Sequence, residues 1–375
     1  MEKASSTVVR KSGIDLLRIL AILMICMFHA RKTFFEALFD LGIDFQLTSF
    51  SRVTWYVTQI IRPFGSVGNI LFMICSAYFL VDNPRARGEK AVHILSDNWL
   101  ISVLILVVYL ICGVSLSSET ILNQIFPTTY KTNWFVSAYV IFYLLAPIVI
   151  VGLKNLSKRA HFGLCIASVI FYGFFSLYDP ILPYYSLVLP FFYILNLVAF
   201  IKWYIPPKSK RWNFMLFFFG SILFLGLFFG CKWLRRLSTF FDEIEFASLY
   251  SPFLVFPLIG LFNLFRDMKF SNRAISYLST CSLFVYVIHE NELFRSITRE
   301  QYYIYMIERF GINYALAFIL LCGIGMFLGG FVLAVIYNET FHRLTKKISA
   351  TIWKGITFLT DQIYNRFFHS NNQES

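Results

Sequence analysis

Apolar residues form long uninterrupted runs along this chain, and the polar residues fall between them. Ten of these runs approach or exceed the about 20 residues with which a helix crosses the hydrocarbon core of a bilayer. They lie at 14–30, 65–82, 94–114, 134–153, 161–177, 182–201, 213–231, 248–265, 279–294 and 311–338. The pattern predicts an all-α fold, a polytopic membrane helix bundle with about ten transmembrane helices.

Composition agrees with a membrane protein. Hydrophobic residues make up 58% of the 375 residues and charged residues only 14%, which excludes an ordinary soluble globular domain. The start, MEKASSTVVRKSG, resembles the basic region of a secretory signal, but no small-residue cleavage site follows the first apolar run. We therefore expect a retained first helix, a membrane domain over 1–345 and a cytoplasmic tail over 346–375.

The distribution of basic residues predicts an orientation. If the N-terminus is cytoplasmic, the cytoplasmic segments carry about twice as many Lys and Arg residues as the outer ones. Both termini are then cytoplasmic, and an outer segment over 50–62 is predicted to form an amphipathic helix. Because the net charge of +12 is spread over many short segments without a nucleic-acid-binding motif, we expect membrane lipids as partners and no nucleic acid.

The first apolar run, LRILAILMICMFHA, carries Arg18 near one end and His29 near the other. Eleven helical positions turn the chain by about 1100° and advance it by about 16.5 Å, so both side chains lie on one face. An ionisable residue within a span suggests a functional site. The alternative interpretations are a snorkelling Arg18 assisted by Asp15, and an interfacial or hydrogen-bonded His29.

Further polar residues occur in three other runs, and each also has a structural explanation. Serine provides a small helix contact, Trp and Tyr are common at the membrane interface, and a histidine followed by a glutamate can be a plain surface pair. These residues are Ser76, Tyr78, Trp134, Tyr286, His289 and Glu290. The seven cysteines are scattered without a C-x-x-C pair, so the sequence predicts no metal site.

Four stretches in this order resemble the acyltransferase 3 family of integral-membrane acyltransferases. They are KSGIDLLRILAILMICMFHA, GNILFMICSAYFLVDN, NWFVSAYVIFYLLAPIV and SYLSTCSLFVYVIHE. The resemblance covers the whole chain, in the short form that has no fused esterase-like domain. It implies an O-acyltransferase, with acetyl-CoA or another acyl-CoA as the donor and no metal. A hydroxyl of a cell-surface polysaccharide or its lipid-linked precursor is the implied acceptor, and the plasma (inner) membrane of a bacterium is the expected location.

The same resemblance suggests roles for individual residues. His29 is the candidate general base, since an imidazole can accept the proton of an attacking hydroxyl near neutral pH. Arg18 is expected on the donor side, to hold phosphates or carbonyls of the acyl-CoA. The expected substrate-binding residues are Asp15, Ser76, Tyr78, Trp134, Tyr286 and His289. Arg85 and Arg87 are further candidates for binding the donor, although this loop departs from the arginine-rich motif of the family.

Two questions of mechanism and class stay open at this point. The acceptor could attack the thioester directly, or the acyl group could first pass to a protein nucleophile such as Cys26, three residues before His29. A transporter or flippase of glycan precursors is an alternative function, because polar residues inside spans also line conduction paths. A structural subunit of an export assembly would leave Arg18 and His29 unexplained.

Overall fold

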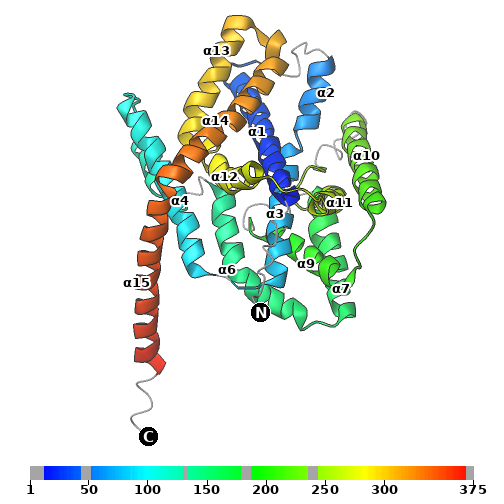
Figure 1. Ribbon diagram of the computed structural model, residues 1–375. Helices are drawn as coiled ribbons and strands as arrows, with labels where there is room; N and C mark the ends of the chain where they lie inside the picture. The colour runs from blue at the N-terminus through cyan, green and yellow to red at the C-terminus, as the bar shows by residue number, and fades with distance from the viewer. Residues whose placement is uncertain are drawn as a thin grey trace.

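The computed structural model describes residues 12–43, 52–85, 87–129, 133–178, 187–234 and 244–368, which form helices and no β-strand (Figure 1). The α-helices are α1 (Gly13–Asp40), α2 (Arg52–Ile61), α3 (Phe64–Asp82), α4 (Gly88–Ile111), α5 (Ser118–Ile125), α6 (Trp134–Lys154), α7 (Lys158–Ser168), α8 (Phe175–Tyr178), α9 (Leu189–Tyr204), α10 (Lys210–Leu234), α11 (Pro252–Arg266), α12 (Arg273–His289), α13 (Glu300–Phe310), α14 (Ala315–Thr340) and α15 (His342–Phe368). Two π-helical segments, η1 (Val169–Phe174) and η3 (Phe294–Arg299), and one 3₁₀ turn, η4 (Ile312–Tyr314), join them. The predicted all-α class is confirmed.

Seven helical segments of the described chain are long and apolar enough to cross a membrane. Each of the ten predicted runs overlaps a helix, but α9, α11 and α12 have only 16, 15 and 17 residues. At about 1.5 Å per residue these three helices fall short of the about 30 Å hydrocarbon core. The count of ten spans and the orientation of the termini thus stay predictions, and residues 182–186 of the sixth run lie outside the described part.

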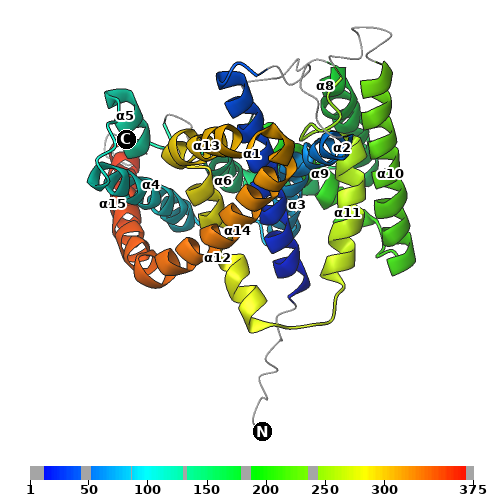
Figure 2. The ribbon, with the colours of Figure 1, turned by 90° about the horizontal axis from the view of Figure 1, so that it is seen from above.

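Helix α1 lies at the centre of the bundle, where it contacts α3, α11, α12, α13 and α14 (Figures 1 and 2). Its inward residues, among them Ala21 and Ile25, are no more than 1% exposed. The contact with α3 is close because Gly68 has no side chain: a Cβ there would lie 2.5 Å from Ile25 Cγ1 and 2.6 Å from the Ala21 carbonyl oxygen. Small residues that let backbones approach are typical of helix packing in membranes.

The outermost helices expose large apolar side chains. On α10 only Asn213, Phe224 and Phe228 are buried, whereas Phe219 and Leu223 are 58% and 52% exposed. Such an apolar surface is unfavourable in water and compatible with lipid tails. This pattern supports a multi-pass membrane protein.

Two helices extend beyond the ranges that hydropathy predicts. Helix α1 continues ten residues past position 30, through the polar stretch that ends at Asp40. Helix α15 begins at His342, runs through the predicted boundary at residue 345 and packs against α4 before it extends away from the bundle (Figure 1). Hydropathy missed α15 because basic residues interrupt its apolar positions. The amphipathic helix predicted over 50–62 corresponds to α2, with residues 50 and 51 outside the described part.

Candidate active site

Arg18 and His29 lie on one uninterrupted helix, α1, as the sequence predicts. The eleven residue steps from Arg18 to His29 correspond to a rise of about 16.5 Å along the helix. Leu17, Ala21, Ile22 and Ile25 pack this stretch into the core with no more than 1% exposure. The helix therefore positions Arg18 and His29 rigidly. One polar region forms around Arg18 and another around His29.

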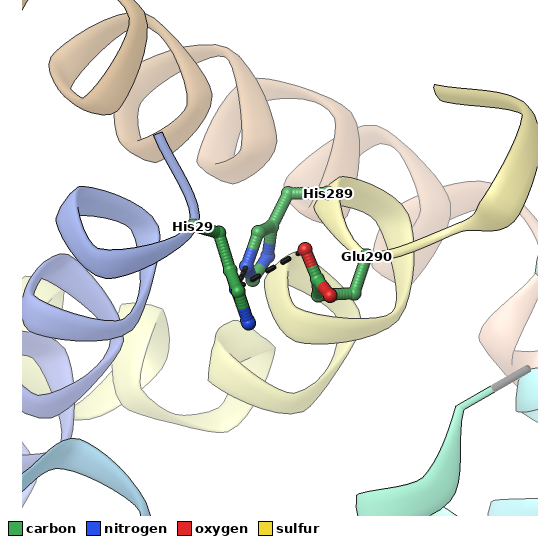
Figure 3. Close-up of side chains that lie close together, drawn as sticks. All are labelled: His29, His289 and Glu290. Atoms are coloured by element: carbon green, nitrogen blue, oxygen red, sulfur yellow. Dashed lines mark hydrogen bonds and ion pairs between the residues drawn. The ribbon is translucent and has the colours of Figure 1, made fainter. Parts of the chain in front are cut away.

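His29 meets the end of α12 in a compact polar cluster (Figure 3). Its Nδ1 atom lies 3.1 Å from Nε2 of His289 and 3.1 Å from Oε1 of Glu290. His289 is the last residue of α12, and Glu290 caps it. Their exposed fractions are only 1% and 9%, so the interpretation of this pair as plain surface residues is wrong. It fails because α1 and η3 both pack against α12.

Arg299 compensates the charge of Glu290. From the end of η3, its Nη2 donates to Glu290 Oε1 at 3.0 Å, and its Nη1 donates to the carbonyl oxygen of His289 at 3.4 Å. Arg299 is 2% exposed, and a buried carboxylate is stable only when it is paired. Sequence reasoning missed Arg299 because it falls in a segment that hydropathy assigns to an outer connection.

The hydrogen bonds of the cluster determine which nitrogen of His29 carries the proton. Nδ1 of His289 lies 2.7 Å from the carbonyl oxygen of Val285, which can only accept, so this nitrogen is protonated and Nε2 of a neutral His289 is an acceptor. Nδ1 of His29 thus faces two acceptors, His289 Nε2 and Glu290 Oε1, and must donate. In neutral His29 the free lone pair is then on Nε2, which points away from the other two side chains (Figure 3).

A cavity of about 790 Å³ surrounds the Arg18 end of α1, and we name it the Arg18 cavity. Four residues singled out in the sequence line it together, namely Asp15, Arg18, Ser76 and Tyr78. Lys90 and Arg266 add two further cations, and Tyr139 and Tyr143 complete its polar wall. A volume of this size is within the about 300–1,000 Å³ of small-molecule and cofactor sites.

Ion pairs and ring contacts fix the walls of the Arg18 cavity. Asp15 lies 3.9 Å from the Arg18 guanidinium and accepts a hydrogen bond from Ser276 at 2.8 Å. Lys202 donates to the carbonyl oxygen of Tyr78 at 2.6 Å, and its Nζ lies 3.6 Å from the centre of the Tyr78 ring. Asp267 also lines the cavity and pairs with Arg266 at 2.8 Å, so three cations outnumber two carboxylates beside the aromatic rings.

A second cavity, of about 380 Å³, continues from the first toward the His29 end. This connecting cavity shares Arg18, Ser76, Lys90 and Tyr139 with the Arg18 cavity and also includes Ile25 and Tyr286. Ile25 lies one helical turn before His29, and the ring of Tyr286 is 5.8 Å from that of His289. The two cavities thus lead from Arg18 to Tyr286, which contacts the His29 cluster, although His29, His289 and Glu290 line neither cavity.

Three of the predicted site residues lie apart from both cavities and from the His29 cluster. Arg85 and Arg87 are exposed in the connection between α3 and α4, although Lys90, three residues later, lines both cavities. Trp134 is the first residue of α6, half-buried, with its ring 5.6 Å from that of Phe135. The geometry brings none of the three side chains to His29 or Arg18.

Comparison with known proteins adds one positive result. No curated protein and no solved structure matches this chain. The family model for an acyltransferase domain matches residues 11–335, nearly the whole length, and includes α1, α12 and the other helices that line the two cavities except α15. The chain therefore belongs to the acyltransferase 3 family.

Proposed function

We propose that this protein is a membrane O-acyltransferase that moves an acyl group, preferably acetyl, from acyl-CoA to a hydroxyl of a cell-surface polysaccharide or its lipid-linked precursor. The observation that carries the proposal is the arrangement along α1: a cationic cavity at Arg18, and at the other end a histidine whose Nδ1 proton is held by Glu290. The family membership supplies the reaction class.

His29 acts in this scheme as the general base. Its Nε2 accepts the proton of the acceptor hydroxyl as the oxygen attacks the thioester carbonyl, and the positive charge that develops on the ring is stabilised by Glu290 at 3.1 Å. The new ester C–O bond forms, the C–S bond breaks, and the proton on His29 passes to the departing CoA thiolate. A positioned base of this kind contributes on the order of 10² to 10⁴ in rate.

The Arg18 cavity is the proposed binding site for the donor. Arg18, Lys90 and Arg266 supply positive charge for the phosphates of acyl-CoA, and Tyr78 supplies an aromatic face. Arg85 and Arg87 precede Lys90 in an exposed loop and are proposed to attract the same polyanion as it approaches. The thioester end then extends through the connecting cavity toward His29.

The cellular setting follows from the same scheme. An acyl-CoA donor is present in the cytoplasm, so the Arg18 end of α1 is proposed to face the cytoplasm and the His29 end the opposite side. This orientation agrees with the excess of basic residues in the predicted cytoplasmic segments. The proposed location is the plasma membrane of a bacterium, where the precursors of cell-surface polysaccharides are assembled.

Transfer of radioactive label tests the proposed function. Membranes that contain the protein are incubated with [¹⁴C]acetyl-CoA, and label is counted in the isolated glycan fraction for wild type, His29→Ala, Glu290→Gln and Glu292→Gln. Glu292 is the matched control, because it lies two residues after Glu290 and pairs with Asn123 instead of His29. We expect label with wild type and Glu292→Gln only. Equal labelling with His29→Ala would exclude the base, and transport of unlabelled precursor without label transfer would favour a flippase.

A further inference from the structure

A second group of metal-ligand side chains lies where α14 and α15 meet α4, apart from the His29 cluster. His93 and Asp97 are one turn apart on α4, and His342 is the first residue of α15. Asp97 Oδ2 lies 3.4 Å from Nε2 of His93 and 3.1 Å from Nδ1 of His342. The Asp97 side chain is 6% exposed, and the two imidazoles are 17% and 31% exposed.

The other oxygen of Asp97 is fully engaged by neighbouring hydroxyls. Tyr337, near the end of α14, donates to Oδ1 at 2.7 Å, and Thr345, in the first turn of α15, donates to the same atom at 2.6 Å. Both residues are buried. These bonds fix the carboxylate so that Oδ2 faces the two imidazoles. Hydrogen bonds from surrounding residues orient metal-binding carboxylates in the same way.

We propose that His93, Asp97 and His342 bind a divalent transition metal, preferably Zn²⁺. In a tetrahedral site with bonds of about 2.0–2.1 Å, ligand atoms lie about 3.3 Å from one another. The separations of the two imidazole nitrogens from Asp97 Oδ2, 3.1 Å and 3.4 Å, match this edge length, and the two nitrogens lie within 4.8 Å of each other. Two imidazoles and one carboxylate suit zinc, whereas Mg²⁺ and Ca²⁺ prefer oxygen ligands alone.

Hydrogen bonding accounts for His342, whose Nδ1 lies 3.1 Å from Asp97 Oδ2, but it accounts less well for His93. Nε2 of His93 lies 3.4 Å from Asp97 Oδ2 and 3.4 Å from Thr345 Oγ1, and both distances exceed the usual 2.7–3.2 Å of an N–H···O bond. A metal ion between the three ligands would satisfy His93 directly.

The His29 cluster is the other group of three ligand-type residues in the described chain that lie this close together. There, Arg299 already donates to the Glu290 oxygen that faces His29. A guanidinium at this position opposes a second cation, whereas no Lys or Arg is recorded as bonded to Asp97 among the described contacts. The charge balance therefore favours metal binding by His93, Asp97 and His342 over metal binding by the His29 cluster.

Such a metal would hold α4 against the junction of α14 and α15. All three ligands also line the connecting cavity, so a fourth coordination position, occupied by water, would face that space. The sequence contains the pair His93 and Asp97 at helical spacing, but the third ligand lies 245 residues later along the chain than Asp97. Sequence spacing alone could not reveal this site.

Metal content of the purified full-length protein tests the proposal. The detergent-solubilised protein is stripped with EDTA, reloaded with Zn²⁺, desalted and measured by inductively coupled plasma mass spectrometry. We expect about one zinc ion per wild-type chain, loss of zinc in His342→Asn and His93→Asn, and retention in His289→Asn, the matched control in the other cluster. Thr345→Val should weaken zinc affinity about 10- to 100-fold, because it removes a bond that orients the carboxylate.

Two further readouts separate metal binding from general misfolding. Co²⁺ in the wild type should give the intense visible absorption of a four-coordinate site, and added Zn²⁺ should raise the melting temperature of wild type but not of His342→Asn. The proposal is overturned if reloaded wild type holds no zinc, or if His289→Asn loses zinc while His342→Asn, with a normal size-exclusion profile, retains it.

Discussion

Removal of the Arg299 guanidinium leaves a buried carboxylate at Glu290 without its cation. Arg299 is 2% exposed, and its Nη2 lies 3.0 Å from Glu290 Oε1. At an effective dielectric constant of about 20, unit charges at this distance attract by about 5.5 kcal/mol, and loss of one partner of a buried pair costs about 3–5 kcal/mol. We expect Arg299→Leu to lose about 3–5 kcal/mol of stability. The double variant Arg299→Leu/Glu290→Leu should recover most of it, because no buried charge remains.

Thermal melting in detergent, followed by size-exclusion chromatography, compares the stability of wild type, Arg299→Leu and the double variant. Arg309→Leu is the matched control, since Arg309 is exposed on α13 and its loss should leave the melting temperature unchanged. The double variant should melt near wild type and still transfer no acyl group, because His29 has lost the carboxylate that stabilises the positive charge on its ring. The reasoning is refuted if Arg299→Leu melts like wild type, or if the double variant melts below Arg299→Leu.

Three further outcomes follow from the structure. Arg18→Ala should raise the KM for acetyl-CoA in initial-rate measurements with equal amounts of folded protein, and an unaltered KM would place the donor elsewhere. Cys26→Ser should keep full activity per folded molecule, because the proposed attack is direct; a loss of activity would indicate an acyl-enzyme relay. Gly68→Val should lower the melting temperature by an amount that corresponds to about 1–3 kcal/mol, since its Cβ would lie 2.5 Å from Ile25; an unchanged melting temperature would contradict the close contact of α1 with α3.

The part of the site that depends on one helix could be predicted from the sequence. Arg18 and His29 are separated by a whole number of turns, so the periodicity of α1 is enough to align them. The family resemblance implied substrate-binding roles for Asp15, Ser76 and Tyr78, and the structure places all three beside Arg18 in the Arg18 cavity.

The part of the site that depends on tertiary packing could not be predicted. Glu290 looked like a surface residue because it lies at the polar end of the run 279–294, and Arg299 because it falls in the connection after that run. Hydropathy does not indicate that neighbouring elements cover them. The same limit applies to His342, because its polar helix α15 begins after the last apolar run and continues into the predicted tail. Hydropathy also does not report where a helix ends, so the count of ten full-length spans stays a prediction.

The rate of acetyl transfer by His29→Gln, measured over a range of acetyl-CoA concentrations with equal amounts of folded protein, tests the central claim most directly. If Nε2 of His29 is the general base, kcat should fall by about 10² to 10⁴, and the KM for acetyl-CoA should stay unchanged because the donor binds near Arg18. A His29→Gln variant with the kcat of the wild type would contradict the account.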